Sequence, residues 1–227
     1  MATDAPMATA TNTATSAQIL TLTQWLSPAY PIGGFAYSQG LEAAVDQGWL
    51  RDGADLEQWL EDMLHHGSGR SDALFLAAAW HAQGATDLAQ INARARAFAA
   101  CKERLFETSQ LGASFGQITQ TIWGGSLMGF TYPVALGAAA AAEDLPLQLT
   151  LALYLQGILS NLVAAGQRLL PVGQTQGQQI LHRLGAQLPD LAAQTCAGDL
   201  DQLSATAFLV DIAAMKHETQ RSRIFRT

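Results

Sequence analysis

The chain has few charged residues and few cysteines for its length. Of 227 residues, 14% are charged and 49% are hydrophobic, which is typical of a compact globular protein rather than a disordered one. A formal net charge of −7 argues against nucleic acid as the main partner. Cys101 and Cys196 have no C-x-x-C spacing, so the sequence predicts neither a disulfide framework nor a zinc knuckle. Both thiols are expected to stay reduced.

The first residues lack the features of a secretory signal. Residues 1–16 are mostly Ala and Thr, with no basic start and no long apolar stretch. We interpret them as a disordered leader. With the unpaired cysteines, this favours a cytoplasmic protein. The expected organisation is a leader over 1–16, an all-helical domain over 17–214 and a basic C-terminal tail over 215–227.

Alternating strand patterns are hard to find, whereas helical periodicity runs through most of the chain. Leu56, Leu60 and Leu64 recur every four residues, and alanine is abundant while β-branched residues are sparse. The charged stretch 86–110 is typical of a solvated helical face. These patterns predict an all-α fold: a single-domain bundle of roughly ten helices.

Charge is also missing from the middle of the chain. Between residues 108 and 167 the only charged residues are Glu143 and Asp144. The stretch 145–167 is long enough to span a bilayer. Its proline, glutamine, serine and asparagine residues are costly inside lipid, so we interpret it as an uncharged central helix wrapped by others. Membrane contact is therefore not expected, although a membrane-embedded helper stays a weaker alternative.

Catalytic motifs are absent or incomplete. Neither a phosphate loop nor a G-x-G-x-x-G sequence is present. GASFG, residues 112–116, matches G-x-S-x-G, but that motif needs a strand before the serine, and the preceding segment is predicted to be helical. We expect small residues packed between helices there. A serine hydrolase that uses Ser114 remains the alternative function.

Metal-binding patterns also fail. His217-Glu218 begins an H-E-x-x-H motif, but Arg221 occupies the position of the second histidine. His65 and His66 are neighbours that point about 100° apart on a helix. The sequence therefore assigns no metal ligands, no cofactor and no enzymatic activity.

The stretch LSPAYPIGGFAYSQGLEAAV, residues 26–45, is unusual because rigid, flexible and aromatic residues adjoin in it. Its prolines fix the exit from one helix, and Gly33-Gly34 permits a tight reversal. Ser38 is a possible N-cap of the next helix. The turn would present Phe35 and Tyr37 where two helices meet, as anchors for a partner. The alternative is an ordinary helix corner in which Phe35 reaches the core while Tyr37 and Gln39 face the partner.

Two stretches resemble the urease accessory protein UreF family. Residues 27–50, SPAYPIGGFAYSQGLEAAVDQGWL, are similar to the family's S-P-x-x-P-x-G-x-F-x-x-S-x-G-L-E signature. Residues 215–227, MKHETQRSRIFRT, are similar to its C-terminal H-E-x-Q-x-x-R-x-F pattern. The resemblance implies an all-helical homodimer that binds the accessory protein UreD, also called UreH, and recruits the GTPase UreG. That assembly delivers nickel to apo-urease, and the UreF-like member regulates the GTPase.

The resemblance also implies which residues meet each partner. On the GTPase side it indicates Pro31, Gly33, Phe35, Tyr37, Ser38, Gln39 and Glu42. On the UreD-like side it indicates His217, Glu218, Gln220, Arg221, Arg223, Phe225 and Arg226.

The tail is basic and short. It holds four of the chain's 12 Lys and Arg residues. Ile224 and Phe225 add too little apolar surface for the tail to fold alone, so we expect it to be mobile until a partner orders it. In that complex, the arginines would contact carboxylates and Phe225 would enter a pocket of the partner.

Overall fold

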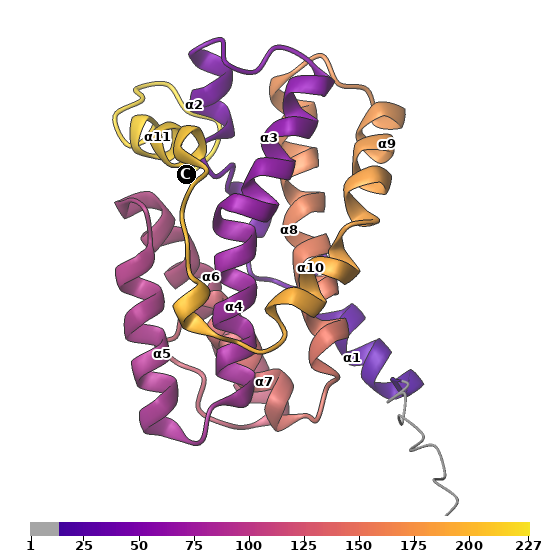
Figure 1. Ribbon diagram of the computed structural model, residues 1–227, viewed down its shortest axis with the longest axis vertical. Helices are drawn as coiled ribbons and strands as arrows, with labels where there is room; N and C mark the ends of the chain where they lie inside the picture. Colours follow the sequence, from indigo (N-terminus) through magenta and orange to yellow (C-terminus); the bar gives the residue numbers. More distant parts are fainter. Residues whose placement is uncertain (1–13) are drawn as a thin grey trace, which may run out of the picture.

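The computed structural model describes residues 14–227, and within that range it contains helices and turns but no strand (Figure 1). The predicted all-α class is therefore confirmed. The α-helices are α1 (Ser16–Trp25), α2 (Leu41–Asp46), α3 (Gly53–His66), α4 (Ser68–His81), α5 (Ala85–Phe98), α6 (Lys102–Trp123), α7 (Tyr132–Ala142), α8 (Leu147–Leu169), α9 (Gln174–Gly185), α10 (Leu188–Thr195) and α11 (Phe208–His217). Two short 3-10 helices are η1 (Gly34–Ala36) and η2 (Leu200–Gln202).

Local sequence signals fix several helix starts. Thr15 caps α1 through a capping box with Gln18. Residues 1–13 of the expected leader lie outside the described residues, and Ser16 already belongs to α1. Asp52 caps α3 by accepting the backbone N–H groups of Ala54 and Asp55. These side chains satisfy N–H groups that have no partner within the helix.

Most residues of α4 are buried, and this helix crosses the middle of the bundle in Figure 1. It packs most extensively against α7, and the two backbones approach closely at Gly137. A Cβ at that position would lie 2.2 Å from the Leu76 carbonyl oxygen, so only glycine fits. The abundance of small residues in this region therefore serves close helix packing within the chain.

α8 is the one helix in residues 14–227 that is long and apolar enough to cross a bilayer. Half of its most apolar 18-residue window is buried, and its neighbours include α2, α3, α4, α9 and α10. α8 corresponds to the predicted uncharged central helix, but α4 has the larger buried share and carries Arg70 and Asp72. Charged side chains therefore lie on the helix that crosses the middle of the bundle.

The G-x-S-x-G match lies inside a helix. Ser114 is in the middle of α6, without the strand and sharp turn that the nucleophile motif requires. Gly112 and Gly116 instead face the segment before α7, where added Cβ atoms would lie 2.2 Å from the Phe130 carbonyl oxygen and 2.7 Å from that of Leu127. The expectation of small residues in close packing is confirmed, and the hydrolase alternative loses its structural basis.

The charged stretch 86–110 is not one solvated helical face. The chain breaks the helix between Phe98 and Lys102, where α5 ends and α6 begins. In α6 the side chains of Arg104 and Glu107 are buried, at 12% and 3% exposed. The prediction was wrong because helical periodicity does not show that charged side chains are paired with each other inside the protein.

Candidate functional site

The two stretches that resemble the UreF family lie side by side in space. The C-terminal segment runs next to α2 in Figure 1. The Thr227 carbonyl oxygen accepts hydrogen bonds from the Ser38 backbone N–H and from the Ser38 hydroxyl, both at 2.7 Å. The Arg226 backbone N–H donates to the Ala36 carbonyl oxygen at 2.8 Å. Segments about 190 residues apart in sequence thus form one structure.

Glu42 is the residue of α2 that holds the tail. It lies near the start of the helix, which follows a left-handed turn at Gly40. Its buried carboxylate accepts the backbone N–H of Ile224 at 2.7 Å and that of Phe225 at 2.9 Å. The same carboxylate faces Nε2 of His217 at 3.3 Å. Because a carboxylate can accept several hydrogen bonds, this one side chain fixes both α11 and the tail.

Glu103 completes the contact from the side of α6. Its carboxylate contacts Nδ1 of His217 at 2.7 Å and accepts a hydrogen bond from the Arg223 guanidinium at 2.6 Å. The His217 ring, fully buried, therefore lies between two carboxylates that come from different helices. We call Glu42, Glu103, His217 and Arg223 the tail clasp.

A second buried charged cluster lies directly beside the tail clasp. The Arg104 guanidinium pairs with the carboxylates of Asp72 and Glu107, and the Tyr154 hydroxyl donates to Asp72 at 2.9 Å. We call Asp72, Arg104, Glu107 and Tyr154 the Arg104 cluster. Burial raises the pKa of Glu107 and the nearby guanidinium opposes this rise. Burial, followed by the Asp72 carboxylate, holds the pKa of Tyr154 well above its usual value.

Gln39 and Thr227 connect the Arg104 cluster to the turn after α1 and to the tail. The Gln39 side-chain amide donates to Glu107 at 2.9 Å, and its oxygen accepts from the Ser68 hydroxyl at 3.0 Å. The Thr227 hydroxyl donates to Glu107 at 3.2 Å. Gln39 has a positive φ of 52°, which a non-glycine residue adopts only where its contacts hold it. One hydrogen-bonded network therefore connects the tail, the turn after α1 and the Arg104 cluster.

Two cavities adjoin the Arg104 cluster. A cavity of about 370 Å³ lies between the turn after α1 and α8, and its lining includes Tyr30, Phe35 and Tyr37. A smaller one, of about 60 Å³, is lined in part by α4, α6 and α11. Asp72, Arg104 and Glu107 border both of them. The cluster is thus the polar wall shared by the two spaces.

Of the two aromatic residues expected to anchor a partner, only Phe35 is exposed, and the alternative with Phe35 in the core is wrong. The Phe35 side chain is 72% exposed, whereas Tyr37 is only 5% exposed and belongs to the core. Ser38 is not the N-cap of α2, because Gly40 occupies that position and the Ser38 hydroxyl is committed to Thr227. Phe35 lies in η1, which has no buried residue, whereas Tyr37 follows this short helix and packs in the core.

The tail is packed rather than free, contrary to the expected mobile tail. Phe225 is 4% exposed, and the Arg168 guanidinium lies 4.4 Å from the centre of its ring. Glu218 accepts the Lys102 backbone N–H at 2.8 Å. The prediction was wrong because it considered only the apolar surface of the tail itself. Carboxylates of α2 and α6 also accept hydrogen bonds from the tail and hold it in place.

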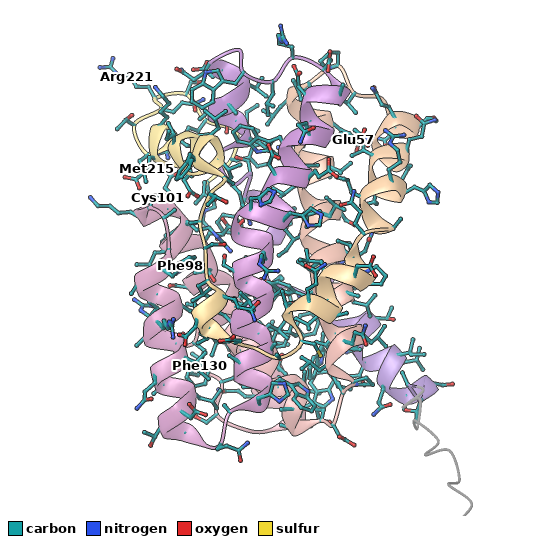
Figure 2. All side chains as sticks on the ribbon, viewed as in Figure 1. Glu57, Phe98, Cys101, Phe130, Met215 and Arg221 are labelled. Atoms are coloured by element: carbon teal, nitrogen blue, oxygen red, sulfur yellow. The ribbon has the colours of Figure 1, made fainter. Side chains whose placement is uncertain are left out.

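The remaining predicted residues divide into exposed and partly buried ones. Pro31, Arg221 and Arg226 are exposed, and Figure 2 shows Arg221 at the periphery beyond α11. Gly33 has a φ of 77°, which a glycine adopts readily in a tight turn. The Gln220 side-chain amide donates to the Ser222 carbonyl oxygen at 3.2 Å.

Sequence reasoning missed the residues of the Arg104 cluster and Glu103. Asp72 offered one signal, since it is a lone acid at the start of the apolar run ALFLAAAW. A charge in that position needs a partner once the helix is buried. Nothing in the sequence identified that partner as Arg104, which lies 32 residues further on.

α11 presents an uncovered apolar face. Phe208, Leu209, Ile212 and Met215 are each more than 40% exposed, and Figure 2 shows Met215 at the outer side of this helix. Ile224 of the tail is exposed as well. Apolar groups gathered in this way are typical of protein interaction sites. Among residues 14–227 there is no group of three or more His, Cys, Asp or Glu side chains arranged to hold a metal ion.

These features define a class of protein before any comparison: an all-α bundle with a docked C-terminal segment and exposed apolar surface suited to contacts with other proteins. Residues 50–185 match the family profile described as UreF. A urease accessory protein UreF of Ruegeria sp. strain TM1040 is 54% identical over 213 residues, which cover 94% of this chain and 100% of that protein. Its counterpart in Ruegeria pomeroyi is 48% identical over 215 residues, covering 95% and 99% respectively. A third, from Cereibacter sphaeroides, is 45% identical over 212 residues, covering 93% and 100%.

The chain therefore belongs to the UreF family of urease accessory proteins.

Proposed function

We propose that this chain is a scaffold in nickel-dependent urease maturation, which bridges a UreD-like accessory protein and the GTPase UreG on apo-urease. The observation that carries the proposal is the convergence of the two family stretches into one network. A rigid network with exposed side chains on either side suits a protein that holds two partners at once, because little entropy is lost on binding. In this role the chain acts in the cytoplasm, as a homodimer, through contacts rather than through a catalytic step.

The UreD-like partner binds the α11 apolar face and the adjoining tail. The exposed apolar residues belong to α11, and the tail that follows this helix carries the exposed side chains of Arg221 and Arg226. Such a surface fits a partner with an apolar centre and acidic residues around it. His217 and Phe225, which are buried, act by holding the tail in shape rather than by touching the partner.

The GTPase binds the turn that follows α1, and contact there regulates its activity. Pro31 and Phe35 are exposed and form the contact surface, whereas Tyr37, Ser38 and Glu42 are buried and position the turn. An exposed phenylalanine on a turn that is fixed at both ends makes a good interface anchor. Docking of the tail would then affect the GTPase surface, since Ala36 and Ser38 bind the tail directly.

Single substitutions on each surface test the proposal. Ile212→Asp on α11 is expected to abolish co-elution with the UreD-like protein, and Phe35→Asp is expected to abolish recruitment of the GTPase. Leu20→Asp, at an exposed apolar position of α1, is the matched control. Thermal melting checks the fold, urease activation in cells reports the function, and sedimentation analysis reports the dimer. Normal assembly and urease activation with both surface variants would contradict the proposal.

A further inference from the structure

The larger cavity beside the Arg104 cluster has both exposed and buried residues in its lining. Its volume is about 370 Å³, which suits a ligand rather than one or two water molecules. Thr23, Pro28 and Phe35 border it and are exposed. All four residues of the Arg104 cluster border it as well. The cavity therefore connects the surface beside the turn after α1 with the buried cluster, and we call it the tyrosine cavity.

Tyr132 offers this cavity a hydroxyl group that is not engaged elsewhere. The side chain lines the cavity and is 7% exposed, and its ring packs against those of Phe115 and Tyr154. Within residues 14–227 its hydroxyl makes no hydrogen bond, whereas the neighbouring Tyr154 hydroxyl donates to Asp72. A buried polar group without a partner is costly, so a ligand that supplies the partner is favoured.

Asp72 has an unused acceptor in the same lining. The Arg104 guanidinium and the Tyr154 hydroxyl both donate to one carboxylate oxygen, Oδ2. The other oxygen, Oδ1, accepts no hydrogen bond from the described residues. Both oxygens of Glu107, by contrast, accept hydrogen bonds from other side chains. The cavity thus offers a carboxylate oxygen and the Tyr132 hydroxyl to a ligand group that carries several N–H donors.

The lining favours a cation over an anion. Among the residues of 14–227 that line the cavity, Arg104 is the only basic one, and it is already paired with Asp72 and Glu107. An anion would thus meet carboxylates whose one basic partner is engaged. Leucines of α1 and α8 add apolar surface for an alkyl stem. Aromatic rings attract cations to their faces, and the lining holds five of them: Tyr30, Phe35, Tyr37, Tyr132 and Tyr154.

We propose that the tyrosine cavity binds an alkylammonium or alkylguanidinium group, which the protein that docks on the turn supplies as a lysine or arginine side chain. The charged end donates to Asp72 Oδ1 and to the Tyr132 hydroxyl oxygen, and the stem lies along the aromatic and leucine side chains. A partner side chain is favoured over a free amine because Phe35 borders the cavity and belongs to the proposed GTPase surface. The inference rests on the proposed function for the identity of the partner, but not for the chemistry of the site.

Small organic cations test that chemistry in the isolated full-length chain. n-Butylguanidinium and n-butylammonium are expected to shift the amide resonances of Gly157 and Asn161, which line the cavity on α8, in a saturable way. Sodium butyrate and 1-butanol, which carry a similar stem, should give no saturable shift in the same concentration range. Equal binding of butanol, or no saturable binding of either cation, would overturn the proposal.

Gly157→Leu fills the cavity without a backbone clash. A Cβ at this position of α8 would meet the Leu26 carbonyl oxygen at 3.9 Å, an ordinary contact, and leucine is the better helix former. Ala164→Leu, at an exposed position of the same helix, is the matched control. Cation binding should be lost in the first variant and kept in the second. Binding that persists in Gly157→Leu would lie outside the cavity and refute the site.

Tyr132→Phe removes the unused hydroxyl and keeps the ring. The affinity for butylguanidinium should fall about three- to tenfold, as expected for one hydrogen bond, while the melting temperature stays close to that of the wild type. Tyr30→Phe is the control, because the Tyr30 hydroxyl is already bonded to Thr119, and it should lower the affinity less. An unchanged affinity in the Tyr132 variant would contradict the assigned contact.

Gly157→Leu also tests where the cation comes from. This variant should no longer recruit the GTPase but should still co-elute with the UreD-like protein, whereas Ala164→Leu should do both. Normal recruitment by a variant that rejects butylguanidinium would overturn the partner side chain as the occupant. If the wild-type chain itself recruits no GTPase, the proposed function fails, while the titration of the isolated chain stands. The two failures are therefore distinguishable.

Discussion

Two arginines of this chain each pair with carboxylates, yet their surroundings differ completely. The Arg104 side chain is 12% exposed and lies between two acids at the bundle centre. Arg183 is 51% exposed and forms a two-pronged contact with Glu57 across α3 and α9, where Figure 2 marks Glu57. The first is surrounded by apolar packing and borders two cavities, and the second is screened by water. Burial, rather than pairing, determines what each contributes to folding.

The largest effect is expected from breaking the buried pair. Arg104→Met leaves the carboxylates of Asp72 and Glu107 uncompensated in the core, so the free energy of unfolding should fall by about 3–5 kcal/mol. Urea denaturation followed by circular dichroism measures this loss. Arg183→Met is the matched control and should leave the denaturation midpoint close to that of the wild type. Equal denaturation midpoints for the two variants would contradict the expectation that the buried Arg104 pairs contribute more to the free energy of unfolding than the exposed Arg183 pair.

Removal of the tail's main acceptor comes next. Glu42→Ala leaves the backbone N–H groups of Ile224 and Phe225 without their partner, at a cost of about 2–3 kcal/mol. The tail should detach while the bundle stays folded, which limited proteolysis followed by mass spectrometry will detect as cleavage after residue 217. Asp46→Ala, at an exposed position of the same helix, should leave the tail protected. A protected tail in the Glu42 variant would show that other contacts suffice.

Close packing along α6 gives a third, smaller effect. Gly112→Ala places a methyl group against the Phe130 carbonyl oxygen and should destabilise the fold by about 1–3 kcal/mol. Ser114→Ala, two residues away on the same helix, should change neither stability nor urease activation. Thermal melting measures the stability of both variants, and an activation assay measures how well each one supports urease activation. Loss of activation with normal stability in the Ser114 variant would revive the hydrolase alternative.

The smallest effect concerns the exposed pair and its pH dependence. The Arg183 hydrogen bond lowers the pKa of Glu57, so any stability from this contact is present above the ordinary pKa of a glutamate, about 4.3, and is lost as the pH falls through the lower folded value. The midpoint difference between wild type and Glu57→Gln should therefore be small at neutral pH and vanish in acid. A difference that grows in acid would mean that Glu57 has another role.

The fold was predictable because helical periodicity and small residues are local properties of the sequence. Leu56, Leu60 and Leu64 are all buried in α3, as their spacing predicts. The side-chain environment was less predictable. The same periodicity that predicted a helical face over residues 86–110 gave no sign that Arg104 and Glu107 face inward, because that depends on Asp72 of another helix.

The candidate site was predictable in part. The family stretches identified Glu42, Ser38, His217 and Phe225, but assigned them to two separate partner surfaces. Contact between residues about 180 positions apart, such as Glu42 and Phe225, leaves no local signal. The sequence did not show that Tyr37 is buried and Phe35 exposed, because a single short 3-10 turn decides which aromatic side chain faces the core.

Glu42 also has a consequence for the order in which the chain is made. A ribosome produces α2 long before it produces residues 217–225, which supply the donors to this carboxylate. During synthesis, Glu42 and Ser38 must remain hydrated or be shielded by another protein. The turn after α1 therefore reaches its final form only after residues 217–227 have left the ribosome. A stalled or truncated chain would expose an unfinished surface at that place, which would mark it for binding by chaperones.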